Sequence, residues 1–229
     1  MTVQESSLLR ADLVEVRDKV AVRTYPVGPP DQESLMIAAM LSAQCPKTES
    51  GSTFLISSES SLPVRHTVRR LLRAFEVLTG KSILHLEFTF DDKRDSVEDA
   101  SITNISPNGG GLPADALLEG KGGERQVMTA RVNAGQTDLL SLVSSGEFAR
   151  FLLAVRTRFH YVLMEGRSLR LSPETVLLAK ASDGVVLTVE RGVTEMANVS
   201  AAQKVARLSN IRLLGFVLET NSKTSRRAG

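Results

Sequence analysis

Short apolar segments alternate with segments of helical periodicity along most of the chain. The apolar segments are near-continuous, as in strands buried on both faces, and most are followed by apolar residues recurring every three or four positions. This alternation predicts an α/β fold: a mostly parallel, doubly wound sheet of about six to seven strands with helices on both faces. The predicted strands span residues 53–58, 82–90, 125–131, 160–166, 183–192 and 210–220.

Residues with strong positional preferences mark several helix ends. Apolar residues recur on one helical face between positions 64 and 78, and Gly80 follows where a left-handed C-cap is expected. Ser172, followed by proline, fits the N-cap of a later helix, and Thr194 is expected to cap the last one. The segment 91–111 is predicted to be a long polar loop. The other predicted helical segments are 33–44, 112–118 and 148–155.

Length and composition fit one globular domain with short appendages. The chain has 229 residues, of which 42% are hydrophobic and 24% are charged, so it is not a disordered chain. We expect a poorly ordered N-terminal arm at 1–32, an α/β domain at 33–220 and a flexible basic tail at 221–229. The single cysteine, Cys45, excludes an intrachain disulfide and fits a reducing cytoplasm.

Composition disfavours several classes of partner. A net charge of +2 gives no case for nucleic acid. Aromatic residues make up 4% of the chain and tryptophan is absent, which argues against a carbohydrate-binding module. No apolar run approaches the roughly 18 residues of a membrane span, and the N-terminus lacks the apolar core of a secretory signal. We therefore expect a cytoplasmic protein without a direct membrane span.

The first strand-to-helix junction is where a ligand is expected, because parallel sheets bind ligands at the carboxyl ends of their strands. The junction reads ISSESSLPVRHTVRR over residues 56–70. A phosphate-binding loop needs glycines, so that backbone amides can surround the phosphate, and a lysine. No glycine lies between Gly51 and Gly80, the junction has no lysine, and Pro63 lacks an amide hydrogen. The junction does not match a phosphate loop.

Several segments in fixed order resemble a known family. They are LVSSGEFARFLL, HYVLMEG, SPETVLLAKA, DGVVLTVERG and GFVLET, with a weaker match at NGGGLPADALLEG. These segments resemble the cytoplasmic module of bacterial polysaccharide tyrosine autokinases of the Wzc and CpsD type. That family belongs to the deviant-Walker group that includes ParA and MinD. The resemblance covers about residues 33–220 and implies a P-loop NTPase-like fold.

The chain differs from this family at the positions where the family binds nucleotide. The phosphate loop corresponds to SLPVRHT, without its glycines and lysine. The acidic motif that holds Mg²⁺ in the family begins at Glu87, and the Walker B aspartate falls on Glu165. The resemblance therefore implies a vestigial nucleotide site made of Ser61, Arg65, His66, Thr67, Glu87, Thr89 and Glu165.

Further family features are missing outside this site. Glu33, Met36 and Ala39 occupy the positions of the family's ExxRxxR oligomerisation pattern, so both arginines are lost. The asparagine expected after the last strand is displaced or missing at Glu219, and the tail has no tyrosine cluster. The resemblance implies a helix at 33–44 that docks on a partner and no longer assembles rings.

The candidate site residues have two interpretations. Arg65 can replace the lost lysine and Thr67 can offer a hydroxyl to Mg²⁺, or both can belong to a solvated helix start. Glu87 and Glu165 can hold a metal as a carboxylate pair, or they can be leftover acids, exposed or paired with Arg65 or Arg167.

Two further residues that could carry chemistry are assigned structural roles. His85 alternates within a predicted strand, so we expect it to be packed or paired. Cys45 lies in a polar loop without the histidine context of a nucleophile. We expect no catalytic residue, no metal site and no cofactor.

The resemblance implies a non-catalytic cytoplasmic component of exopolysaccharide, capsule or holdfast export. Such a protein would bind a membrane polysaccharide co-polymerase or a kinase partner, lie at the inner membrane through that partner, and could form a homo-oligomer. The first alternative is an active but atypical ATPase or tyrosine autokinase that uses ATP and Mg²⁺. The second alternative is a positioning adaptor like ParA or MinD.

Overall fold

In the part of the chain that the structure describes, seven strands form one sheet. The computed structural model describes residues 29–44, 50–59, 64–88, 103–105, 127–132 and 138–219. The strands are β1 (Ser52–Ser58), β2 (Ile83–Phe88), β3 (Thr103–Ile105), β4 (Val127–Val132), β5 (Tyr161–Gly166), β6 (Gly184–Glu190) and β7 (Leu213–Glu219). Their order is β3-β4-β2-β5-β1-β6-β7, and every neighbouring pair is parallel. The predicted parallel α/β sheet is confirmed.

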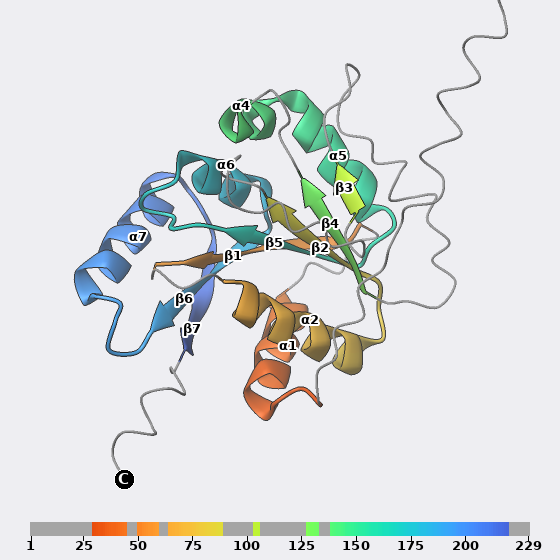
Figure 1. Cartoon of the computed structure of the whole chain (residues 1–229), viewed down its shortest axis with the longest axis horizontal. Coiled ribbons are helices and arrows are strands. Elements are labelled where there is room, and N and C mark those ends of the chain that lie inside the picture. Colours follow the sequence, from red (N-terminus) through yellow and green to blue (C-terminus); the bar gives the residue numbers. More distant parts are fainter. Residues whose placement is uncertain are drawn as a thin grey trace, which may run out of the picture.

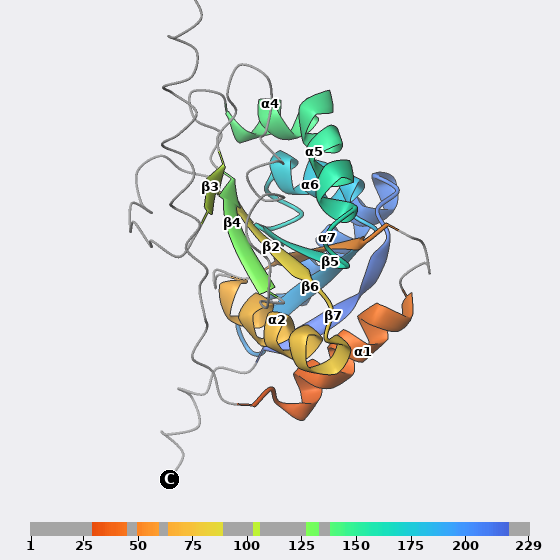
Figure 2. The same ribbon diagram turned by 90° about the vertical axis from the view of Figure 1, so that its right-hand side faces the viewer.

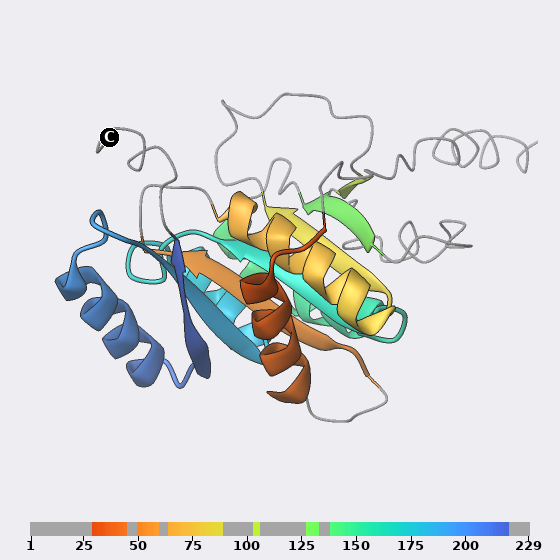
Figure 3. The same cartoon turned by 90° about the horizontal axis from the view of Figure 1, so that it is seen from below.

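Helices cover both faces of the sheet (Figures 1 and 2). They are α1 (Gln32–Gln44), α2 (Arg65–Thr79), α4 (Leu139–Ser144), α5 (Gly146–Arg156), α6 (Pro173–Ala181) and α7 (Met196–Leu208). α1 and α2 lie side by side on one face, as the view from below shows (Figure 3). α4, α5, α6 and α7 contribute to the core on the opposite face. Among the described residues, no helix has the length and apolar character needed to cross a membrane.

The sheet separates two hydrophobic cores. Beneath α1 and α2, Phe54 of β1 stacks on Phe75 of α2 with ring centroids 6.2 Å apart. On the opposite face, Phe148 and Phe151 of α5 pack with their centroids 6.3 Å apart. Each such fully buried side chain contributes about 1.5–3 kcal/mol through removal of apolar surface from water. Every residue of β1 is buried, as expected for a central strand covered on both sides.

Two of the predicted helix ends are confirmed and one is wrong. Gly80 adopts the left-handed conformation with φ of 61°, and its N–H donates to the carbonyl of Glu76. The Ser172 hydroxyl accepts from the N–H of Thr175 at 3.1 Å, which caps α6. Thr194 does not cap α7, because its hydroxyl accepts from the N–H of Glu190 at 2.9 Å and α7 starts two residues later.

Two short elements lie outside the predicted pattern. β3 interrupts the segment 91–111, which we predicted to be loop, and pairs in parallel with β4. α4 precedes α5 and is capped by Asp138, whose carboxylate accepts from the N–H of Ser141 at 2.8 Å. The helical turn predicted at 112–118 lies outside the described residues.

The described structure begins within the predicted N-terminal arm. Asp31 accepts from the N–H of Ser34 at 2.8 Å, and Arg70 of α2 donates two hydrogen bonds to the same carboxylate, both at 3.0 Å. Arg70 also reaches Glu219 of β7 at 3.4 Å. These contacts hold the start of α1 against α2. The rest of the arm and the basic tail lie outside the described residues.

Candidate functional site

The carboxyl ends of β1 and β5 are the position where a sheet of this topology binds ligands. β1 and β5 are neighbours, with Ile56 opposite Glu165 and Ser57 opposite Gly166. The chain leaves β1 toward α2 on one face and leaves β5 toward α6 on the other. We call this position the switch point, because neighbouring strands lead to opposite faces there.

Hydrogen bonds join the two segments that leave the switch point. The Ser57 hydroxyl donates to the carbonyl of Arg167. The carboxylate of Glu59, which is buried, accepts from the Ser168 hydroxyl at 2.6 Å and from the N–H of Leu169 at 2.7 Å. We call these five residues the β1–β5 bridge. Both oxygens of a buried negative charge are thus satisfied by protein groups.

A glycine allows α6 to approach the end of β5. A Cβ atom on Gly166 would lie 2.9 Å from Cγ2 of Thr175, closer than real Cβ contacts come. The Thr175 hydroxyl accepts from the N–H of Arg167 at 3.0 Å. The start of α6 therefore fixes the backbone that carries the β5 side of the bridge.

The start of α2 presents an arginine, a histidine and a buried hydroxyl. Arg65 and His66 occupy the first turn, and the N-cap residue Val64 makes no side-chain capping bond. Cations are unfavourable at this end of a helix dipole. The Thr67 hydroxyl is buried and donates to Glu219 at 2.5 Å, while the largely exposed His66 lies 3.9 Å from the same carboxylate. Thr67 and His66 are thus directed toward β7.

Glu87 lies buried between two arginines. It stands opposite Arg131 in the pairing of β2 with β4, and Arg131 donates to its Oε2 at 3.0 and 3.3 Å. Arg65 of α2 reaches the same oxygen at 3.5 Å. The other oxygen, Oε1, has no hydrogen-bond partner within the described part of the chain, although the Glu87 side chain is only 3% exposed.

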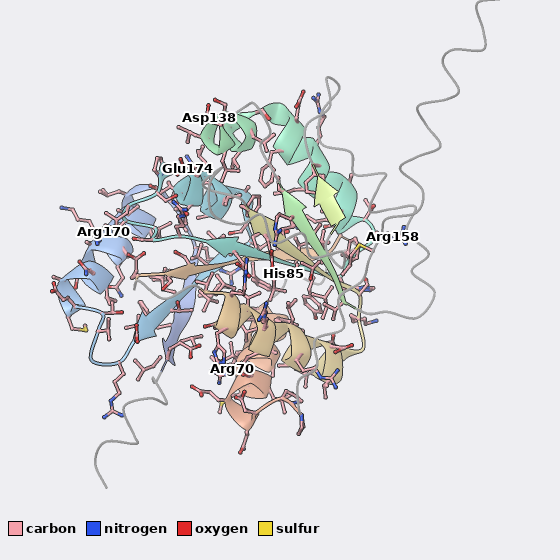
Figure 4. All side chains as sticks on the ribbon, in the orientation of Figure 1. Arg70, His85, Asp138, Arg158, Arg170 and Glu174 are labelled. Carbon is pink, nitrogen blue, oxygen red and sulfur yellow. The ribbon has the colours of Figure 1, made fainter. Side chains whose placement is uncertain are left out.

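His85 is fully buried and paired with Glu165. Its Nε2 lies 2.9 Å from Oε1 of Glu165, and its Nδ1 lies 3.4 Å from the Thr129 hydroxyl. Because an ionised carboxylate only accepts hydrogen bonds, Nε2 carries a proton in this arrangement. The expectation that His85 is packed or paired is met in both respects. Figure 4 shows His85 within the sheet, on the side of Arg70 and α2.

Three of these side chains form one compact group. His85, Glu87 and Glu165 each offer a ligand atom, and these atoms all lie within 4.8 Å of one another. We call this group the His–Glu cluster. It faces α2, because His85 and Glu87 share the strand face of Ile83, which packs in the core beneath that helix.

The structure brings together part of the predicted site. Arg65, Glu87 and Glu165 lie at the His–Glu cluster, whereas His66 and Thr67 contact Glu219. Ser61 and Thr89 lie outside the described residues.

Sequence reasoning missed Glu59 and Arg131. A carboxylate directly after a buried strand is a signal that could have singled out Glu59. The pairing of Arg131 with Glu87 depends on the register of two strands, which the sequence does not reveal.

Comparison with known proteins supports the fold and nothing finer. No family model and no curated protein sequence matches the chain. Among solved structures, the chimerical protein CapA2B2 aligns with 87% of this chain and 92% of its own, at 14% identity and a TM-score of 0.60. The kinase domain of the Escherichia coli tyrosine kinase ETK aligns with 79% of this chain and 71% of its own, at 13% identity and a TM-score of 0.57.

The kinase domain of VpsO aligns with 83% of this chain and 97% of its own, at 17% identity and a TM-score of 0.54. The chain has the fold of a bacterial tyrosine-kinase domain. At these identities the likeness concerns the backbone, and function has to be argued from the residues at the site.

Proposed function

We propose that this protein is a non-catalytic component of exopolysaccharide, capsule or holdfast export. In this proposal it lies in the cytoplasm and binds a membrane co-polymerase, or a kinase partner, at the inner membrane. The observation that carries the proposal is the β1–β5 bridge, which holds the buried carboxylate of Glu59 at the switch point.

ATP and Mg²⁺ are the cofactors that a tyrosine-kinase fold implies, and we infer that the residues at the switch point do not fit a triphosphate. Two like unit charges 4 Å apart near a protein surface repel by about 4 kcal/mol. The phosphates would meet the charge of Glu59 in this way. They would also have to displace its hydrogen bonds to Ser168 and Leu169.

The two side chains that could replace a phosphate loop already contact carboxylates of the protein. Arg65 pairs with Glu87, and the Thr67 hydroxyl donates to Glu219. Either group would have to leave its carboxylate partner before it could contact nucleotide or its metal. Phosphoryl transfer depends on positioned charge around the phosphates, so this arrangement favours a protein that binds partners without catalysis.

The exposed face of α1 is the surface we assign to the partner. Met36 and Met40 are 58% and 55% exposed, and Glu33 and Ala39 are exposed on the same helix. Methionine side chains adapt to many partner surfaces. The opposite face of α1 packs on α2 through Ala38 and Leu41.

An active ATPase or tyrosine autokinase is the second candidate. Two observations favour it: one oxygen of Glu87 has no hydrogen-bond partner in the described part of the chain, and ligand atoms of Glu87 and Glu165 lie within 4.8 Å of each other. In that case Arg65, Thr67, Glu87 and Glu165 would handle ATP and Mg²⁺.

Phosphate release and phosphotyrosine formation by the purified chain separate the two candidates. With ATP and Mg²⁺ we expect neither product above background. Activity that disappears in Arg65→Ala and Glu165→Ala, but persists in the exposed control Arg150→Ala on α5, would establish the second candidate and reject the first.

Docking is tested by co-purification with a polysaccharide co-polymerase from the same organism. We expect Met36→Glu combined with Met40→Glu to weaken the complex at least about tenfold, because charge enters an apolar contact. The control Leu208→Glu changes an apolar residue on α7 that is still more exposed, at 75%, and should leave the complex unchanged. Equal losses in both variants would remove α1 as the docking surface.

A further inference from the structure

We propose that the His–Glu cluster binds one divalent transition-metal ion and does so without nucleotide. The three ligand atoms of His85, Glu87 and Glu165 lie within 4.8 Å of one another; Glu87 and Glu165 are the last residues but one of β2 and β5, and His85 lies in the middle of β2. The inference is independent of the proposed function, because neither a phosphate nor a partner takes part in it.

The unpaired oxygen of Glu87 is the independent observation that points to a ligand. A buried carboxylate oxygen normally has a hydrogen-bond partner, and in the described part of the chain Oε1 has none. The Glu87 side chain is 3% exposed, so bulk water does not readily supply that partner. A cation between Glu87, His85 and Glu165 would satisfy this oxygen.

The donor set selects the class of metal. One imidazole nitrogen and two carboxylates suit Zn²⁺, Mn²⁺, Fe²⁺, Co²⁺ or Ni²⁺, whereas Mg²⁺ and Ca²⁺ prefer oxygen ligands alone. His85 therefore distinguishes this site from one built only of carboxylates. Zn²⁺ and Co²⁺ are suitable probes because both accept nitrogen and oxygen ligands at about 2.0–2.2 Å.

Closing the cluster around an ion requires a modest movement. Ligands about 2.1 Å from a tetrahedral metal lie about 3.4 Å apart, so the separations of up to 4.8 Å have to contract. Glu165 can supply the movement because its side chain is 13% exposed, while His85 is fixed by burial. As Glu165 moves away, the ring of His85 stays in place and its neutral imidazole takes the tautomer with the proton on Nδ1. Nε2 is then free to bind the metal, and Nδ1–H donates to the Thr129 hydroxyl, which lies 3.4 Å away.

The neighbouring arginines set the affinity. Arg131 and Arg65 orient Glu87 through its other oxygen, but their positive charges repel a metal ion bound nearby. With three protein ligands and this opposing charge, we expect Zn²⁺ to bind more weakly than at a structural site with four protein ligands.

The test is a metal titration of the untagged, purified full chain without nucleotide. Zn²⁺ is measured by competition with a chromogenic chelator, and Co²⁺ by the visible absorption of a site with nitrogen ligation. We expect one ion per chain, and at least about tenfold weaker binding in Glu165→Gln and in His85→Gln. The controls His160→Gln and Glu195→Gln change exposed residues outside the cluster and should bind as the parent does.

Circular dichroism checks that each variant is folded. Glu165→Gln is the decisive variant, since its side chain is partly exposed and its loss should leave the core intact. No binding up to about 100 μM Zn²⁺ would overturn the proposal, as would equal binding by parent and folded Glu165→Gln, or binding that requires added ATP.

Discussion

The β1–β5 bridge and the His–Glu cluster both lie toward the carboxyl ends of central strands. They differ in how their charged groups are paired. In the bridge, both oxygens of Glu59 accept hydrogen bonds from the segment after β5. In the cluster, Glu87 holds two arginines with one oxygen and leaves the other without a described partner. The first region is closed by protein groups, and the second retains ligand atoms.

This difference implies that the two regions suit different ligands. A triphosphate requires donors and positive charge at the switch point, where this chain places a carboxylate. A cation requires carboxylates and imidazole, which the cluster still supplies. The proposals made above for the two regions, that the first rejects a triphosphate and the second accepts a cation, can therefore be tested separately.

The largest expected effect concerns the charge balance of the cluster. Arg131→Met removes the closest partner of Glu87 and leaves Arg65 at 3.5 Å. Breaking a buried ion pair from one side costs about 3 kcal/mol, so urea unfolding should show a loss of that size. The control Arg65→Met removes the more exposed partner and should cost less than about 1 kcal/mol. Equal losses would show that α2 and β4 balance Glu87 alike.

The next largest effect tests how much the charge of Glu59 contributes to the stability of the β1–β5 bridge. Glu59→Gln keeps the shape of the side chain but removes a charge that accepts two hydrogen bonds, and we expect the free energy of unfolding to fall by about 2 kcal/mol. The exposed control Glu195→Gln should change it by less than about 0.5 kcal/mol. A loss at Glu59 as small as that of the control would mean that the bridge does not stabilise the switch point.

The smallest effect concerns an ion pair outside both regions, which serves as a reference for them. Hydrogen bonds from Arg70 hold the pKa of Asp31 well below its ordinary value of 3.8, with a further contribution from Ser34. Asp31→Ala removes this pair and the N-cap of α1, and should cost about 1 kcal/mol at pH 7.

The pH dependence of this loss has a definite sign. A carboxyl group whose pKa is lowered by folding stabilises the fold above its ordinary pKa, and the stabilisation disappears as the pH falls toward the folded value. The difference between parent and Asp31→Ala in urea unfolding should therefore be constant above about pH 5 and shrink below about pH 4. A difference that grows in acid would contradict the assignment of Asp31 to Arg70.

Much of the fold could be predicted from the sequence because buried parallel strands and capped helices leave local signals. The apolar run of β1 and the glycine after α2 are examples. β3 was missed because a strand of three residues within a polar segment has no usable periodicity. The prediction that Thr194 caps α7 was wrong because its hydroxyl accepts a hydrogen bond from the backbone N–H of Glu190, within the turn before the helix.

The candidate site was predicted less completely because it depends on strand register. The sequence singled out Glu87 and Glu165, but the step from two carboxylates to a three-ligand cluster required His85 to point at Glu165 from the neighbouring strand. The same holds for Arg131, which meets Glu87 only through the pairing of β2 with β4. Such pairs are set by tertiary structure and leave no local pattern.

Calorimetric titration of the purified chain with ATP at millimolar Mg²⁺ tests the central claim most directly, because it measures triphosphate binding apart from catalysis. We predict no saturable heat up to millimolar ATP, since Glu59 holds together the two segments that leave the switch point and the sequence of residues 56–70 contains neither glycine nor lysine. Saturable binding with a dissociation constant below about 10 μM would show that this edge of the sheet still holds a nucleotide and would contradict the account.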